Sequence, residues 1–552
     1  MSISKEDLGV LERLRKDLEN EKEAILKVWK EIASYIGMAY GDWGKDPNSK
    51  KLPVYRNVDT TAANASKILA DGVEGYAFSD NMEWFGLEIM SMAENGDEKA
   101  ARSLLDKATT CIYRMLADAD FYDEARSFVR SGADMATACM TFAFDKAKNK
   151  FRFNTVHLKD VLPISNEYKE VDSLMRYVYL TKRQAERFFD TELPQAVKDC
   201  EDPLKLFTFI NFVAPVTDWD FEVNGDGDYL SIWWYENDTE RTLKEERISG
   251  KNFACWRYSK PIYGGNWGVD SPGMISLPVM HYINLLVEDF VTLGELQAKG
   301  HWKKTKGLKV NFKAGGVTDL EAGQDFAYVG AAGDLTWLQA QIEHYREVIN
   351  ANYDTDLFLV LTQNLEKSKT ATEVAGIENE KNNLMAAFFT RLAREFLEPV
   401  ITWAFTTALL YAQIPDLTAE ELEQLKDLDI KVQFVSPTYR AQEKAFSLTS
   451  SLQWVNDCLG LAQAHPDVLD RIDWDRLIEI DHKIRHAKEE LLVDAKAANQ
   501  ARQARANAQA QAMQQQQNMD QSAALGDLYS KLSKPMEQGS AAEALMGGSN
   551  GR

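Results

Sequence analysis

The residues that could do chemistry in this 552-residue chain match no common enzyme template. A nucleotide-hydrolysing phosphate loop needs the pattern GxxxxGK[ST], which the sequence lacks, and the cluster GGNWG (264–268) lacks the GxGxxG spacing of a dinucleotide site. No GxSxG nucleophile elbow occurs. These observations favour a structural or binding role over that of an enzyme.

Two candidate metal sites each fail at a specific position. His482 and His486 stand four residues apart on a predicted helix, but the residues between them include no glutamate for an HExxH site. A calcium loop of the EF-hand type starting at Asp218 would need a glycine where Val223 stands. We therefore expect no metal and no cofactor, and we interpret the histidines as surface residues.

A short basic segment, TQNLEKSKTATEV (362–374), interrupts a strongly acidic chain. Lys367 and Lys369 precede Thr370 and Glu373, whose S/T-x-x-E spacing predicts a capping box at the start of a helix. The chain as a whole carries 85 acidic and 63 basic residues. That balance argues against tight, non-specific DNA binding, which depends on clustered Lys and Arg, but it allows DNA to pass without adhering. From these residues alone, the segment is an ordinary surface loop.

Composition indicates a soluble globular protein with two to four packed regions, since 45% of residues are apolar and 27% charged. No uncharged apolar run approaches the roughly 18 to 20 residues of a membrane span. The start MSISKEDLGVLERL does not resemble a secretory signal, so we expect a cytosolic chain. The cysteines are odd in number and form no CxxC pair, which predicts buried, reduced thiols: Cys111, Cys139, Cys200, Cys255 and Cys458.

The first part of the chain is predicted to be mainly helical. Residues 4–37 carry apolar side chains at helical intervals behind a cap-like pair, Ser4 and Asp7. Further helices are expected over 58–75 and 98–130, with Trp84 and Phe85 in a hydrophobic loop between them.

Residues 151–260 are predicted to form an α+β module. Short runs rich in β-branched and aromatic residues predict strands, and Thr181 with Gln184 predicts a capped helix among them. The strand candidates are FRFNTVHL, SLMRYVYL, FTFINFVAPV and YLSIWWYEN.

The Gly- and Pro-rich stretch PIYGGNWGVDSPG marks a boundary, after which helices dominate again. We expect helices over 276–299, 336–352 and from Thr370 onward, with a kink at Pro399. The alternation in GLKVNFK predicts a strand with an exposed basic face, and FAYV predicts another. More helices are expected over 440–490. The Ala- and Gln-rich tail after Asp494 is either a helix packed on copies of itself or disordered. The predicted fold class is α+β, mainly α-helical.

Three separated segments resemble one family. RNVDTTAANASKILADGVEGYAFSDNMEWFGLEI (56–89) resembles a D-S/T-T helix that leads to "WF" and a strand in podovirus head-to-tail connector, or portal, proteins. The segment 263–290 resembles that family's passage from a "YG…P" turn into a long helix, and 353–401 resembles its "TATEV…E" region. The order and spacing of the segments agree over about 400 residues.

The resemblance implies a portal fold in a ring-shaped homo-oligomer, usually a dodecamer, at one capsid vertex. Double-stranded DNA would be packaged and ejected through its channel. By position, the implied regions are a wing (1–271), a stem helix (272–299), a clip (300–335), a second stem helix (336–357), a tunnel loop (358–369), a long helix with the remainder of the wing (370–436), a crown (437–493) and a tail (494–552).

The resemblance also assigns roles to lysines. Glu366, Lys367 and Lys369 would lie in the tunnel loop, where ring symmetry turns each lysine into a belt that touches phosphates weakly. Five clip lysines either face an acidic partner or belong to a solvated loop: Lys303, Lys304, Lys306, Lys309 and Lys313.

The implied partners are other copies of the chain, DNA held transiently, the large subunit of the packaging terminase, a tail adaptor, and the major capsid and scaffolding proteins. No membrane is implied, and the protein would be assembled in the host cytoplasm into the virion. The alternatives are another structural virion protein without a channel, such as a tail adaptor or scaffold-associated factor, and a virion hydrolase, which the motifs do not support.

Overall fold

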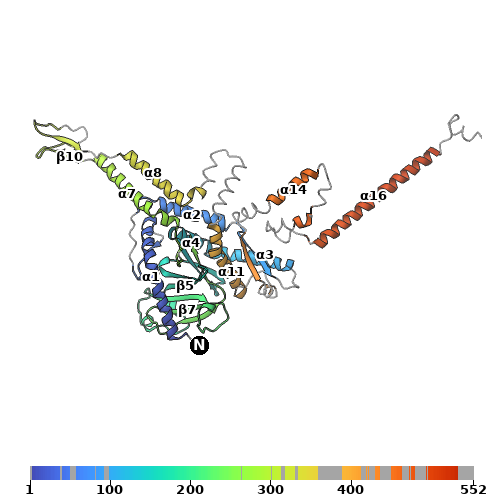
Figure 1. Ribbon diagram of the computed structural model, residues 1–552, viewed down its shortest axis with the longest axis horizontal. Helices are drawn as coiled ribbons and strands as arrows, with labels where there is room; N and C mark the ends of the chain where they lie inside the picture. Colours follow the sequence, from blue (N-terminus) through green and yellow to red (C-terminus); the bar gives the residue numbers. More distant parts are fainter. Residues whose placement is uncertain are drawn as a thin grey trace, which may run out of the picture. The chain divides into compact units, whose positions relative to one another are not determined.

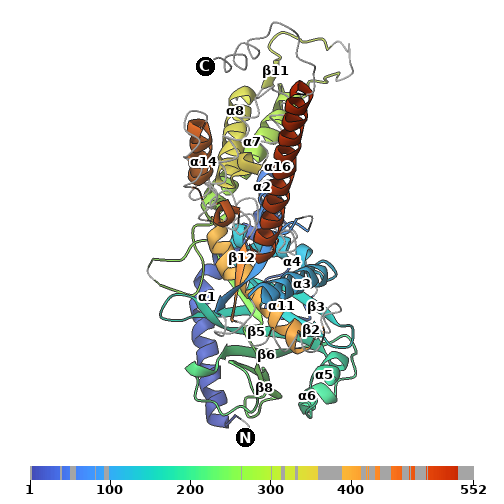
Figure 2. The ribbon, with the colours of Figure 1, turned by 90° about the vertical axis from the view of Figure 1, so that its right-hand side faces the viewer.

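The computed structural model describes most of the chain (Figures 1 and 2). It divides into two compact units, residues 1–454 and 455–552, which are described separately. The described residues are 3–37, 40–49, 57–80, 82–91, 98–262, 264–299, 301–311, 318–329, 334–358, 388–411, 418, 421, 425, 429–434, 449–462, 472, 474–478, 493 and 495–532.

The first unit begins with four helices, α1 (Lys5–Ile36), α2 (Thr61–Ala77), α3 (Glu98–Ala117) and α4 (Phe121–Met135). The predicted cap of α1 is confirmed, because the side chain of Ser4 accepts from the backbone of Asp7 in a full capping box. The helix predicted over 98–130 is present as two helices, α3 and α4. Residues 118–120 separate the two helices, and Asp120 is the residue before α4.

Two antiparallel sheets follow, and they confirm the predicted α+β module. A three-stranded sheet has the order β3-β2-β9, and a five-stranded sheet has the order β4-β5-β6-β7-β8. The predicted capping box of Thr181 and Gln184 starts α5 (Lys182–Phe188), and α6 (Gln195–Lys198) follows. The strands are β2 (Thr137–Asp145), β3 (Lys150–Val156), β4 (Val161–Ser165), β5 (Val171–Thr181), β6 (Leu206–Pro215), β7 (Tyr229–Tyr235), β8 (Lys244–Ile248) and β9 (Phe253–Arg257).

One hydrophobic cluster joins these helices to both sheets. Trp84 lies in a loop, as predicted, and Phe85 starts a strand instead; both side chains are in the core, with 0% and 2% of their surface exposed. Phe85 opens strand β1 (Phe85–Ser91), which pairs antiparallel with β12 (Asp429–Phe434). No local pattern signals this strand pair, because its two members lie far apart in the sequence.

A helical hairpin extends from this core (Figures 1 and 2). It consists of α7 (Pro272–Lys299) and α8 (Leu335–Asn352), as predicted, and its tip is the strand pair β10 (His301–Lys304) and β11 (Phe326–Val329). We refer to α7 and α8 as the hairpin, to β10 and β11 with residues 305–311 and 318–325 as the tip, and to α1–α4, both sheets and α11 as the body.

The strand predicted over GLKVNFK is wrong across its described residues, whereas the FAYV strand is confirmed as β11. Residues 305–308 form a turn instead, with Gly307 at φ +92° and the Leu308 amide bonded to the Thr305 carbonyl. The partner of β11 is the segment before this turn, so the apolar alternation after it does not enter a ladder.

Of the described helices, α7 alone is long and apolar enough by composition to cross a membrane, because an 18-residue stretch of it has a mean hydropathy of 1.2. The helix is not free of charge, however, since it contains Glu288 and Asp289. Only 28% of the apolar stretch is buried within this chain. One such helix is weak evidence for a membrane segment, but it shows that much apolar surface on α7 is left without cover.

A helix is described from residue 388 onward. It contains a π-helical turn at Ala393–Leu397 and continues as α11 (Glu398–Leu410). This turn directly precedes Pro399, where a kink was predicted, and it accommodates the proline because that residue lacks the N–H of a regular helical bond. Helix α14 (Thr449–Ala462) contains the division between the two units. In the second unit, the tail forms the helix α16 (Ala495–Leu532), whose described side chains are nearly all exposed.

Candidate functional site

The hairpin presents an apolar stripe to solvent. Ile275, Pro278, Tyr282 and Leu285 follow one another at steps of three or four residues on α7 and are all exposed. The exposed fractions of Ile275, Tyr282 and Leu285 are 53%, 44% and 45%. Helices that bury such a stripe usually do so against another helix, because apolar residues at this spacing line one face. We name these four residues the α7 stripe.

The charges of the hairpin are mostly negative. Exposed carboxylates occur at five positions, Glu288, Asp289 and Glu295 on α7 and Glu343 and Glu347 on α8. The guanidinium of Arg346 is neutralised by ion pairs of 2.9 Å to both Asp59 and Glu343. Acidic side chains therefore dominate the described hairpin surface.

A buried carboxylate holds the base of the hairpin. Asp134, at the end of α4, accepts hydrogen bonds from the hydroxyls of Tyr40 (2.6 Å), Ser66 (2.9 Å) and Tyr353 (2.9 Å), while Arg130 lies 3.8 Å away. Tyr353 directly follows α8, so this hub ties the hairpin to α2 and α4. Burial raises the pKa of the Asp134 carboxyl, although its four polar neighbours act in the opposite direction.

A second anchor joins the segment just before α2 to both hairpin helices. The Asn284 side chain on α7 accepts hydrogen bonds from the backbone amides of Val58 (2.7 Å) and Asp59 (3.2 Å). The Asp59 carboxylate in turn holds Arg346 of α8. Asp59, Asn284 and Tyr353 belong to the three separate segments that carry the family resemblance, and the structure brings those segments together at this base.

The Gly-rich boundary has a steric cause. A Cβ atom on Gly268 would lie 1.9 Å from the carbonyl oxygen of Ala136, and one on Gly273 would lie 2.1 Å from that of Asp134. Both contacts are with backbone, which cannot move aside cheaply. The start of α7 can therefore lie against the end of α4 only because these positions lack a side chain.

The lysines of the tip do not all lie on one face of the β10–β11 strand pair. Lys303 pairs with Asp325 at 3.1 Å, and the ammonium of Lys304 donates to the Leu308 carbonyl at 3.0 Å. These two residues are neighbours on β10, so they point to opposite faces of the strand pair. Lys306 and Lys309 are exposed, and Lys313 lies outside the described residues.

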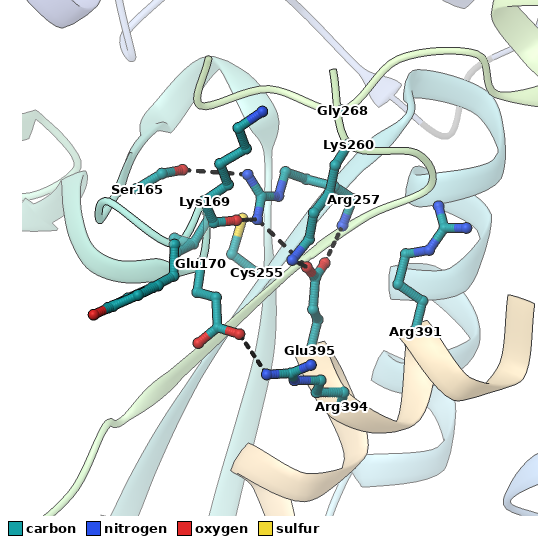
Figure 3. Close-up of polar contacts among 12 residues, drawn as sticks. Ser165, Lys169, Glu170, Cys255, Arg257, Lys260, Gly268, Arg391, Arg394 and Glu395 are labelled. Carbon is teal, nitrogen blue, oxygen red and sulfur yellow. Dashed lines mark hydrogen bonds and ion pairs between the residues drawn. The ribbon is translucent and has the colours of Figure 1, made fainter. Parts of the chain in front are cut away.

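Residues 359–369 of the predicted tunnel loop, with Glu366, Lys367 and Lys369, also lie outside the described residues, as do Thr370, Glu373, His482 and His486. The structure does show how the helix after the loop is fixed (Figure 3). Glu395, in the π-helical turn, accepts from the backbone amide of Arg257 (3.0 Å) and pairs with the guanidinium of Arg257 (3.4 Å) and the ammonium of Lys260 (3.0 Å). The side chain of Arg257 is fully buried, so this carboxylate compensates a positive charge that water does not reach.

Sequence reasoning did not identify Asp134, Asp59 or the pair of Arg257 and Glu395. Each is an isolated polar residue whose partners are distant in sequence, so no local pattern signals it. Among the described residues, no three His, Cys, Asp or Glu side chains gather closely enough to hold a metal ion.

A body with a projecting hairpin that exposes an apolar stripe indicates an assembly protein, since exposed apolar surface of this kind is often covered by other chains. Comparison with known proteins identifies the family. The sequence model for bacteriophage head to tail connecting proteins matches residues 9–484, and the chain belongs to this family. The resemblance inferred from the three segments is thereby confirmed.

Two curated relatives are similar over most of their length. A "probable portal protein" of Bordetella phage BPP-1 is 25% identical over 521 residues, covering 89% of both chains. The portal protein of Salmonella phage epsilon15 is 23% identical over 527 residues, covering 90% of this chain and 91% of the relative.

Proposed function

We propose that this protein is a phage portal that forms a ring at one capsid vertex, through which double-stranded DNA is packaged and ejected. Membership of the head-to-tail connecting family and the names of both relatives support the portal function. The observation that carries the ring is the α7 stripe, because a monomer would leave it in water.

In a ring, each hairpin lies beside the hairpins of its neighbours. A stripe of apolar residues at three- and four-residue steps suits packing of this kind, and a cyclic arrangement buries the same stripe in every copy. On this proposal α7 and α8 are the stem, the tip is the clip, the body is most of the wing, and the second unit contributes crown and tail.

The acidic hairpin suits a channel through which DNA slides. Carboxylates at the five exposed positions repel phosphates, so a duplex would not adhere to the wall. Lys367 and Lys369 of the tunnel loop would add two narrow basic belts, each making weak and salt-dependent contacts. Another protein, the terminase, would supply ATP hydrolysis.

The tip is the proposed docking site for the terminase or a tail adaptor. Lys306 and Lys309 offer exposed positive charge there, whereas Lys303 is already paired. An acidic partner surface would be attracted to the two exposed lysines in every copy of the ring.

The proposal is tested by imaging the purified protein. Negative-stain microscopy and native mass spectrometry should show a ring of about twelve copies with a hole wide enough for a duplex. A stable monomer at micromolar concentration would contradict the portal proposal, and a closed assembly without a hole would favour an adaptor role.

A further inference from the structure

Two cysteines face each other in the centre of the body. Cys139 on β2 and Cys255 on β9 are directly paired across the three-stranded sheet, and their Sγ atoms are 3.1 Å apart. A disulfide bond needs an S–S distance of about 2.05 Å, so the two sulfur atoms must approach by only about 1 Å. Both side chains are buried, with 0% and 2% of their surface exposed.

The hydrogen-bond ladder shows that the backbone geometry also suits a bond. The amides of Tyr258 and Phe142 donate to the carbonyls of Ala136 and Asn252, which makes 136/258 and 142/252 hydrogen-bonded pairs. Pair types alternate along an antiparallel ladder, so Cys139 and Cys255 occupy a non-hydrogen-bonded pair. The Cα atoms of such a pair are about 4.5 Å apart, within the range that a disulfide spans.

The surroundings influence how fast the thiols react. Burial raises the pKa of the Cys139 thiol, while the positive charges of Lys22 and Lys251 act in the opposite direction. Thiolate is the reactive form, so oxidation at neutral pH will be slow. A buried pair is also more accessible to a small oxidant such as a peroxide than to a bulky disulfide.

We propose that Cys139 and Cys255 are an oxidisable pair that forms a cross-strand disulfide. The Cys139 thiolate attacks hydrogen peroxide, the O–O bond breaks, and a sulfenic acid and water form after proton transfer. The Cys255 sulfur then attacks the sulfenic sulfur, and the second oxygen leaves as water. Two thiols and one peroxide thus yield one disulfide and two waters.

The bond would close a long loop. Residues 139 and 255 are 116 positions apart, and the intervening chain contains the whole five-stranded sheet. Cross-linking the ends of such a loop restricts the unfolded chain, which stabilises the fold. The geometry of the cysteine pair does not depend on the proposed function. The moment at which the disulfide would form does rest on it, because a virion leaves a reducing cytoplasm for an oxidising exterior.

The test uses full-length protein treated with hydrogen peroxide, then unfolded and alkylated. Free thiols should fall from five to three per chain, and peptide mass spectrometry should find residues 139 and 255 linked. The melting temperature should rise by about 5 °C or more and return on addition of dithiothreitol. Persistence of five free thiols, or a link that involves Cys200 instead, would overturn the proposal.

Matched variants separate the pair from the other cysteines. Cys200→Ser, at the partly exposed thiol, should keep the link and its temperature shift, whereas Cys255→Ala should lose both and leave a Cys139 sulfenic acid that dimedone traps. If Cys255→Ala does not fold, the wild-type peptide map still decides. The map reads the bond in a monomer or a ring alike, so failure of ring formation would not be mistaken for failure of this inference.

Discussion

The body and the hairpin treat apolar surface in opposite ways. The body buries its largest aromatic residues completely, including Trp29, Trp84 and Trp256, and the apolar residues that it exposes most lie in turns: Tyr168, Leu204 and Ile262. The hairpin instead lines up exposed apolar residues along α7. The body therefore obtains its stability from contacts within one chain, whereas the hairpin is folded but keeps an apolar surface that the proposed ring would cover.

Polar groups differ between the two regions in the same way. Asp134 and Arg257 are buried in the body and are held by specific partners, so removing a partner leaves a costly uncompensated group. The carboxylates of the hairpin are exposed and hydrated, and single changes among them cost little. Substitutions in the body should therefore reduce the free energy of unfolding most. Substitutions on the hairpin surface should change it little and should instead affect assembly.

The largest effect on folding is expected from Gly273→Ala. The new Cβ would lie 2.1 Å from the carbonyl oxygen of Asp134, which forces the start of α7 away from the end of α4. We expect a loss of about 4 kcal/mol in the free energy of unfolding, or no soluble protein at all. Urea denaturation followed by circular dichroism measures the change.

Gly294→Ala is the matched control on the same helix. Nothing lies within 4 Å of the Cβ that this change would add, so it should be neutral or stabilise the helix by up to about 1 kcal/mol. Equal destabilisation by both substitutions would show that α7 tolerates no alanine for glycine anywhere and would contradict the steric explanation.

The next effect is expected from Asp134→Ala, which removes the acceptor of the buried Tyr353 hydroxyl and leaves the Tyr40 hydroxyl only its longer contact of 3.4 Å to the Arg130 carbonyl. The loss should be about 3 kcal/mol, and Asp134→Asn should recover most of it because the amide oxygen can still accept. Chemical denaturation of both variants measures the difference.

The pH dependence of stability in the wild-type protein and in Asp134→Asn tests whether burial favours the protonated form of the Asp134 carboxyl. Burial raises the pKa of Asp134 in the folded protein above its unfolded value, so the contribution to stability is complete below the unfolded pKa and is lost as pH rises through the folded pKa. Relative to Asp134→Asn, the wild-type protein should therefore become less stable as pH increases over that window. If the wild-type protein instead became more stable than Asp134→Asn as pH increases, hydrogen bonding to the carboxylate would outweigh burial at this site.

Local signals in the sequence predicted the elements well, because a helix cap or a strand alternation lies within a few residues. The capping boxes at Ser4 and Thr181 and the β11 strand are examples. The strand at GLKVNFK was wrong because alternation does not reveal which segment pairs with β11. Asp134 could not be predicted, since its three hydroxyl partners are 94, 68 and 219 residues away in sequence.

A smaller effect is expected at the junction between body and hairpin. Arg346→Met removes the ion pair to Asp59, a side chain that is almost fully buried, although the backbone amide of Thr61 still donates to it. Because Arg346 itself is partly exposed and screened by solvent, we expect a loss of about 1 kcal/mol. Glu343→Gln, which removes the other, exposed partner of Arg346, should leave stability unchanged. If the two variants unfolded at the same urea concentration, the junction would not depend on Asp59.

The smallest effect on folding, with the largest on assembly, is expected from Leu285→Lys in the α7 stripe. The side chain is 45% exposed in the single chain, so a lysine there should change the free energy of unfolding by less than about 0.5 kcal/mol. In a ring the same ammonium would be buried against a neighbouring hairpin at every interface, which is costly without a partner charge. Native mass spectrometry should therefore show monomers in place of rings. Thr292→Lys puts the same charge almost two turns further along the same face, beyond the stripe, and should still assemble. Normal rings from Leu285→Lys would place the contact between copies elsewhere and would show that the exposed stripe does not hold the ring together.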